Sequence, residues 1–181
     1  LAENRLESHP GGVWFVDLAP VSLPERVAQS VAAPLGIKEE PGTPLPATIA
    51  HRLGGKRVLL VLDNCEHLLS ACAEFADALL SACQGLKVVA TSREGLGVDG
   101  ERLYSIRSLS VPRTATGGSL SEIEASEAVR LFVDRARAVA PEFTLSAETA
   151  PGITEICRRL DGIPLAIELA AARTKLLSLE Q

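Results

Sequence analysis

The chain has 181 residues, of which 46% are hydrophobic and 23% are charged, and its formal net charge is −5. These proportions are typical of globular proteins, so they exclude a disordered or fibrous chain. The length suits one domain, or one domain and a small part of a second. The acidic balance argues against a surface dedicated to binding nucleic acid or acidic lipid.

Sorting signals and metal-ligand patterns are not found in the sequence. No apolar run approaches the roughly 18 to 20 residues that span a bilayer. The four cysteines form no CxxC pair, so we expect buried, reduced thiols in a cytoplasmic protein, with a disulfide or redox role as the alternative. His9, His51 and His67 are scattered along the sequence, so we expect solvated or capping histidines. The sequence contains no methionine and begins at Leu1, so we interpret it as a piece of a longer chain.

The N-terminal part of the chain alternates between predicted strands and helices. Apolar and β-branched runs predict strands at residues 13–18, 58–62, 87–91 and 103–106. Apolar residues at helical spacing predict helices at residues 23–35, 47–53 and 66–83. This order predicts an α/β fold with a parallel sheet, in which helices bury the central strand on both faces. A ligand site is expected beyond the carboxyl ends of the strands.

A change of composition marks the second part of the chain. Residues 112–120 are rich in Pro, Thr, Gly and Ser, which predicts a linker between an α/β domain of residues 1–111 and an all-helical domain of residues 121–181. Within the helical domain we expect helices from Glu124 or Ser126 to about Pro141, from Ser146 to Leu160, and from Leu165 to Leu177.

Asp63 follows the apolar run of residues 59–62 at the carboxyl end of a predicted strand. In P-loop NTPases an aspartate at this position holds magnesium, directly or through a water molecule. The alternative is that Asp63 caps the helix that begins near Glu66. The pattern alone leaves both interpretations open.

Thr91, Ser92 and Arg93 end the next predicted strand, at the same edge of the predicted sheet. A guanidinium group forms charge-assisted hydrogen bonds with phosphate, so Arg93 could sense or stabilise a γ-phosphate there. The alternative is a loop arginine that pairs with Glu94 or Glu101.

Gly162 and Pro164 separate the last two predicted helices, because glycine commonly ends a helix and proline commonly starts one. Together with the two strand ends, this motif resembles the nucleotide-binding domain of the STAND class of P-loop ATPases, the NB-ARC-like group. The sequence is most similar to the ATPase modules of large bacterial transcriptional regulators with a C-terminal helix-turn-helix. The resemblance covers nearly the whole chain and rests on VWFVDLAP at 13–20, LLVLDNCEHLL at 59–69, ATSREGL at 90–96, EAVRLF at 127–132 and DGIPLAIELAAAR at 161–173.

The resemblance implies a P-loop NTPase sheet followed by a small helical domain that closes over ATP or ADP and Mg²⁺. The resemblance implies two catalytic residues. Asp63 is the Walker B aspartate that holds Mg²⁺, and Arg93 is the sensor arginine that faces the γ-phosphate. The residues that it implies in nucleotide binding are Thr91, Ser92, Gly162 and Pro164, the last on the adenine side.

Two features depart from that family. Asn64 stands where many of these ATPases carry an acidic residue, and its neutral amide cannot act as a general base. Glu66 is a candidate substitute, although glutamate at a helix start more often complements the helix dipole. The sequence has no GxxxxGK[ST] phosphate-binding loop, and the turn at residues 54–56 does not replace one. We therefore expect slow ATP hydrolysis only in a longer chain that supplies this loop.

The missing loop has a structural consequence. In that fold the P-loop strand lies between the strand that ends at Thr91 and the predicted strand at 103–106, so its removal leaves two strand edges unpaired. Direct pairing of residues 88–91 with residues 103–106 would contradict this placement.

Two functions from different classes follow from the sequence. The first is an ATP/ADP-binding switch of a signal-transduction ATPase that controls transcription, with the nucleotide and other domains of the same chain as partners and self-association left open. The second is a non-catalytic protein-interaction scaffold derived from a P-loop fold. A processive AAA-type ATPase is disfavoured by Asn64. We expect no direct binding of nucleic acid or membrane by this region, so any DNA binding would belong to a neighbouring domain.

Overall fold

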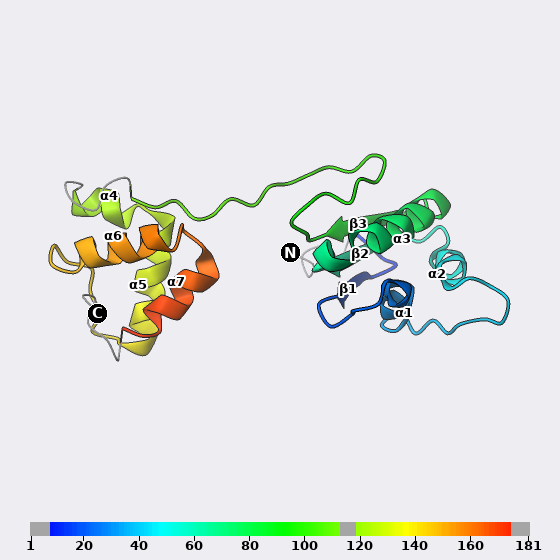
Figure 1. Cartoon of the computed structure of the whole chain (residues 1–181), viewed down its shortest axis with the longest axis horizontal. Helices are drawn as coiled ribbons and strands as arrows, with labels where there is room; N and C mark the ends of the chain where they lie inside the picture. The colour runs from blue at the N-terminus through cyan, green and yellow to red at the C-terminus, as the bar shows by residue number, and fades with distance from the viewer. Residues whose placement is uncertain (1–7, 113–118, 175–181) are drawn as a thin grey trace. The chain divides into compact units, whose positions relative to one another are not determined.

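Three parallel strands form a sheet in the computed structural model, which describes residues 8–112 and 119–174 (Figure 1). The strands are β1 (Val13–Asp17), β2 (Val58–Asp63) and β3 (Leu86–Ala90), and they lie in the order β1-β2-β3. The register pairs Asp17 with Asp63 and Leu62 with Ala90. The predicted α/β fold with a parallel sheet is therefore confirmed, and the three strands end at one edge.

Helices connect these strands and pack on one face of the sheet. They are the 3₁₀ helix η2 (Pro24–Arg26), α1 (Val27–Ala32), α2 (Leu45–Leu53), the 3₁₀ helix η3 (Cys65–Leu68) and α3 (Leu69–Ala82). Val16, Leu60 and Leu62 point into the core that these helices share with the sheet, and each is at most 4% exposed. Burial of such side chains stabilises the fold by about 1.5–3 kcal/mol each. The three helices predicted for this part of the chain are present, the first of them ending at Ala32.

No helix of the described residues packs on the opposite face of the sheet, which corrects the prediction that helices bury the central strand on both faces. Phe15 of β1 is 58% exposed and Val89 of β3 is 41% exposed. Val61 of β2 lies between them in the register and is half-buried. Alternate residues of a strand point to opposite faces, so these three side chains share one face. The described residues leave this part of the face uncovered.

The predicted strand at 103–106 is wrong. Residues 101–112 form neither helix nor strand, and Leu103, Tyr104 and Ile106 are 74%, 90% and 88% exposed. A strand is stabilised by the neighbour on which its side chains pack, and the sheet of the described residues contains β1, β2 and β3 alone. Direct pairing of this segment with β3, which would have contradicted a missing strand at that edge, is not observed.

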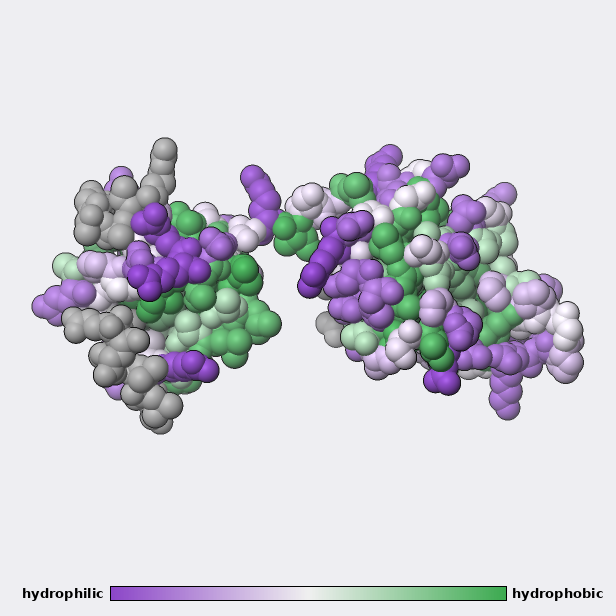
Figure 2. Space-filling view, in the orientation of Figure 1, coloured by the Kyte–Doolittle hydropathy of each residue, from purple (hydrophilic) through white to green (hydrophobic). Residues whose placement is uncertain are grey.

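The chain divides into two compact units, Leu1–Leu103 and Tyr104–Gln181, and each is described by itself. The second unit consists of α4 (Leu120–Glu124), α5 (Glu127–Val139), α6 (Ala150–Arg159) and α7 (Pro164–Ala171). Phe132, Ile153 and Ile167 are fully buried at its centre. Leu165 and Leu169 of α7 are more than half exposed, and Figure 2 shows hydrophobic surface in green over this part of the unit.

Several predicted bounds of the helical part differ from the structure. The helix expected from Ser146 begins at Ala150, because the Ser146 hydroxyl accepts backbone N–H groups in the turn before it. The last helix ends at Ala171, and the predicted continuation beyond residue 174 lies outside the described residues. Most of the predicted linker, residues 113–118, also lies outside them. The domain boundaries stay a prediction.

The four cysteines are free thiols, and all are buried as predicted. Burial raises the pKa of the Cys157 thiol to about 11, so this thiol stays protonated and unreactive near neutral pH. No helix within residues 8–112 and 119–174 is long and apolar enough to cross a membrane.

Candidate functional site

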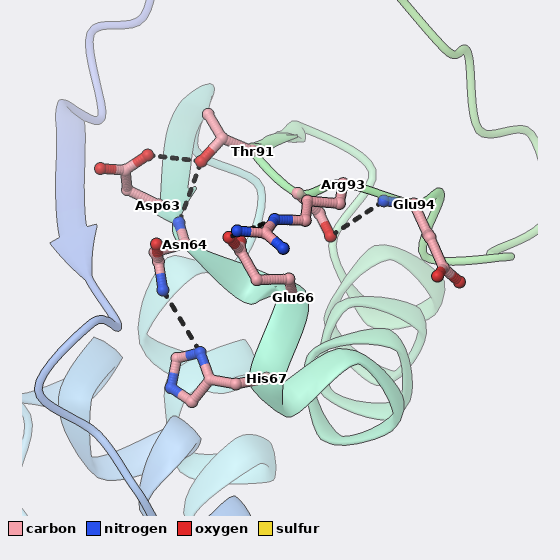
Figure 3. A network of polar contacts seen from close by, with 8 residues as sticks. Asp63, Asn64, Glu66, His67, Thr91, Arg93 and Glu94 are labelled. Atoms are coloured by element: carbon pink, nitrogen blue, oxygen red, sulfur yellow. Dashed lines mark hydrogen bonds and ion pairs between the residues drawn. The ribbon is translucent and has the colours of Figure 1, made fainter. Parts of the chain in front are cut away.

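Asp63 and Thr91 meet at the carboxyl edge of the sheet (Figure 3). Asp63 is the last residue of β2, and Thr91 follows the last residue of β3. The Thr91 hydroxyl donates a hydrogen bond to Oδ1 of Asp63 and accepts one from the backbone N–H of Asn64 at 2.9 Å. The sequence predicted that these two strand ends lie at the same edge of a parallel sheet. The contact between the two side chains depends in addition on the register of β2 against β3.

The backbone of Thr91 also joins the two strand ends. Its N–H donates to the carbonyl of Leu62 at 2.9 Å, and its carbonyl accepts the N–H of Cys65 at 2.9 Å. All polar groups of Thr91 are therefore engaged with the end of β2 or the first turn after it. Oδ2 of Asp63 makes no hydrogen bond with the described residues, so one oxygen of the carboxylate is fixed and the other is available.

Asn64 has a structural role that its sequence position did not predict. Its backbone adopts the left-handed conformation, with φ 65° and ψ 51°, which asparagine tolerates better than most residues. Its Nδ2 lies 3.3 Å from Nδ1 of His67, and Nε2 of His67 lies 2.7 Å from the carbonyl oxygen of Val21. A carbonyl can only accept, so Nε2 of His67 carries the proton and Nδ1 accepts from the Asn64 amide. The histidine thus links the start of η3 to the loop after β1.

Arg93 pairs with Glu66 at the same edge. The distance from Nε of Arg93 to Oε1 of Glu66 is 3.7 Å, and the two side chains are 86% and 32% exposed. An ion pair this exposed contributes little to stability, so the guanidinium can exchange Glu66 for another anion.

The alternative of a loop arginine paired with a carboxylate is thus observed, but the partner is Glu66, and no ion pair of Arg93 with Glu94 or Glu101 is found among the described residues. The Glu94 N–H donates to the Ser92 hydroxyl at 3.4 Å. The Glu101 carboxylate accepts the backbone N–H groups of the turn at residues 96–97, at 2.9 and 2.8 Å. Glu101 therefore holds the loop after β3 and not the arginine.

Gly162 and Pro164 lie in the helical unit, between α6 and α7. Gly162 has φ +66°, and a Cβ atom there would lie 2.1 Å from the carbonyl oxygen of Leu109. Its own carbonyl accepts the N–H of Leu109 at 2.9 Å. Only glycine fits this close approach of two backbones. Pro164 is the first residue of α7 and is exposed, as the sequence predicted for a helix start.

The donors at the sheet edge fit magnesium. Mg²⁺ is usually bound by one or two carboxylates, with water and substrate phosphates completing its octahedron. Within the described parts of the chain, no three His, Cys, Asp or Glu side chains are grouped as a metal site. A single oriented carboxylate, that of Asp63, therefore suits a magnesium ion that arrives with a nucleotide and does not suit an all-protein metal site.

Comparison with known proteins relates this chain to one segment of larger proteins. No protein-family model matches it. A Mycobacterium tuberculosis protein provisionally named HTH-type transcriptional regulator is 45% identical over 167 residues, which cover 92% of this chain and 18% of that protein. A Mycobacterium bovis protein with the same provisional name shows the same values. An uncharacterized Mycobacterium tuberculosis protein is 45% identical over 167 residues, 92% of this chain and 39% of its own length. The chain thus spans about one fifth to two fifths of the length of these curated relatives.

Proposed function

We propose that this chain is part of an ATP/ADP-binding switch of the STAND, NB-ARC-like class of P-loop ATPases, which acts in the control of transcription. The observation that carries the proposal is the Asp63 carboxylate at the carboxyl end of β2, held by Thr91 from the neighbouring strand. Parallel α/β sheets bind their ligands beyond the carboxyl ends of the strands. The transcriptional role rests on the names of the relatives.

The strand order supports this proposal. In the P-loop fold of this class the phosphate-binding strand lies next to the strand that carries the sensor arginine. Here that strand is β3, and within the described residues its only partner is β2. The neighbouring edge is therefore available to a further strand, and the exposed Phe15 and Val89 leave room for a further helix on the open face. The strand that leads into the missing P-loop fits the edge beside β3, and the helix that follows the P-loop fits the open face.

Each candidate residue has a defined task in the proposed site. Asp63 would hold Mg²⁺, which would supply positive charge against the phosphates of the nucleotide. Arg93 leaves Glu66 and donates to the γ-phosphate, because a doubly charged phosphate is a stronger partner than an exposed carboxylate. The resemblance assigns Pro164, the first residue of α7, to the adenine side of the nucleotide. Ser92 remains a candidate for a phosphate contact.

A nucleotide titration tests the proposal with the full protein as its gene encodes it. ADP and ATP affinities are measured with magnesium and in EDTA for the wild type and for Asp63→Asn, Arg93→Ala and Asp17→Asn. Asp63→Asn should lose at least about tenfold in affinity with magnesium, and Arg93→Ala should lose ATP affinity but little ADP affinity. Asp17→Asn is the matched control, because Asp17 pairs with Asp63 in the register and, within the described residues, its carboxylate accepts only the N–H of Ala19, at 2.8 Å. Absence of nucleotide binding by the wild type would refute the switch.

The second candidate function is a protein-interaction scaffold without nucleotide chemistry. The observation that favours it is the apolar surface of α7, where Leu165 and Leu169 are 65% and 62% exposed. It predicts that Asp63→Asn and Arg93→Ala leave the regulator's activity in cells unchanged, whereas Leu165→Glu abolishes it. The switch predicts instead that Asp63→Asn and Arg93→Ala each reduce that activity.

A further inference from the structure

We propose that Thr91 is a positioning residue that orients the Asp63 carboxylate toward magnesium, and that its side chain does not itself bind the nucleotide. This inference rests on the proposed function and goes beyond it. The resemblance assigned Thr91 a place among the nucleotide-binding residues, whereas the geometry points to Asp63 as the partner of its hydroxyl.

The hydroxyl of Thr91 both donates and accepts a hydrogen bond. A threonine hydroxyl has one proton to donate, and Thr91 donates it to Oδ1 of Asp63. The same oxygen accepts the N–H of Asn64 at 2.9 Å. A phosphate oxygen could receive this proton only if the Asp63 carboxylate lost it. Since both partners belong to the end of β2, the hydroxyl is committed to that strand.

The bond leaves the carboxylate in one orientation. Asp63 stands at an exposed strand end, where a free carboxylate rotates about its χ1 and χ2 angles. The hydrogen bond to Oδ1 stops this rotation, and Oδ2 remains without a partner among the described residues, as Figure 3 shows. The bond occupies one lone pair of Oδ1, and Oδ2 is the oxygen that Asp63 offers to magnesium in a defined direction. Partners that fix a ligand in this way usually matter about tenfold to a hundredfold for metal affinity.

The backbone of Thr91 also has a structural role, which does not depend on its side chain. Its backbone N–H and carbonyl join β2 to β3 through Leu62 and Cys65. Substitution of the side chain leaves these backbone bonds in place. Thr91→Val keeps the branched shape and replaces the hydroxyl by a methyl group, and Thr91→Ser keeps the hydroxyl and removes the methyl group. The two variants therefore separate the hydrogen bond from the shape of the side chain.

The first experiment measures the contact between the two side chains without nucleotide. Urea unfolding of this chain, followed by Trp14 fluorescence, is compared for the wild type, Thr91→Val, Asp63→Ala and the double variant. The two substitutions should be non-additive, with a coupling of about tenfold in the unfolding equilibrium constant, because a hydrogen bond to a charged group is lost in each. Additive effects would overturn the proposed contact.

The second experiment measures the role toward magnesium in the full protein. ADP affinity is determined with magnesium chloride and in EDTA, and the ratio of the two is the readout. Thr91→Val should reduce this ratio about tenfold or more and leave the affinity in EDTA unchanged, and Thr91→Ser should restore the ratio. A residue that only supports the fold, or that binds the nucleotide directly, would lower both affinities alike. A wild-type ratio in Thr91→Val overturns this inference alone, whereas a wild type that binds no ADP overturns the proposed function and the inference together.

Discussion

Replacement of Gly162 by alanine is expected to destabilise the helical unit by about 4 kcal/mol. The left-handed φ of +66° costs alanine about 1–2 kcal/mol. The new Cβ would lie 2.1 Å from the Leu109 carbonyl oxygen, a backbone atom that can move only if the Leu109 N–H leaves the Gly162 carbonyl. That hydrogen bond contributes about 1 kcal/mol, and the forced shift adds about 1–3 kcal/mol. Far-UV circular dichroism during urea unfolding measures the loss.

Gly36→Ala is the matched control for this experiment. Gly36 has φ +65°, nearly the angle of Gly162, but nothing lies within 4 Å of the position of its Cβ. It should therefore cost only the conformational strain, about 1–2 kcal/mol, read from Trp14 fluorescence in the first unit. If Gly162→Ala destabilises no more than Gly36→Ala, the close backbone approach does not explain the glycine, and a role in ligand binding becomes the better reason for it.

Two further predictions concern the core and the start of α5. Leu62→Ala, at a fully buried position, should cost about 2–5 kcal/mol by Trp14 fluorescence, whereas Phe15→Ala, at a side chain 58% exposed, should cost about 1 kcal/mol or less. The backbone N–H and the hydroxyl of Ser110 lower the pKa of Glu127 in the folded state. The stabilisation that they provide is therefore complete above the ordinary glutamate pKa of about 4.3, and it is lost as the pH falls through the lowered pKa of the folded protein. Glu127→Gln, which removes the titrating carboxyl group, should reduce the loss of stability of the helical unit below about pH 4, and an unchanged acid profile would contradict this assignment.

The central part of the sheet could be predicted because its signals are local. The run at residues 58–62 is apolar throughout, and its neighbours have the spacing of βαβ units, which fixes parallel strands that end at one edge. The segment at 103–106 has the same local signal and forms no strand. Its propensity is real, but a strand also needs a neighbour, and the described residues offer it none.

The candidate site was predictable to the level of strand ends and no further. The contact between Thr91 and Asp63 depends on the register of β2 against β3, and the contact between His67 and Val21 joins residues that are 46 positions apart. Neither is encoded in a local pattern. The exposure of Phe15 was missed for a related reason, because alternation tells which residues share a face but not what covers that face.

The geometry after β2 bears on what the proposed switch can do with ATP. A residue that activates water must present a carboxylate or another base to it. Asn64 instead adopts the left-handed conformation, and its amide donates to Nδ1 of His67. An aspartate at this position would bring an acceptor oxygen to an acceptor nitrogen. The residue beside Asp63 thus holds the chain, while Oδ2 of Asp63 has no hydrogen-bond partner in the described part of the chain. In the proposed switch Asn64 therefore supplies no base, which leaves Glu66 as the candidate carboxylate after β2 and predicts slow hydrolysis while that carboxylate pairs with Arg93.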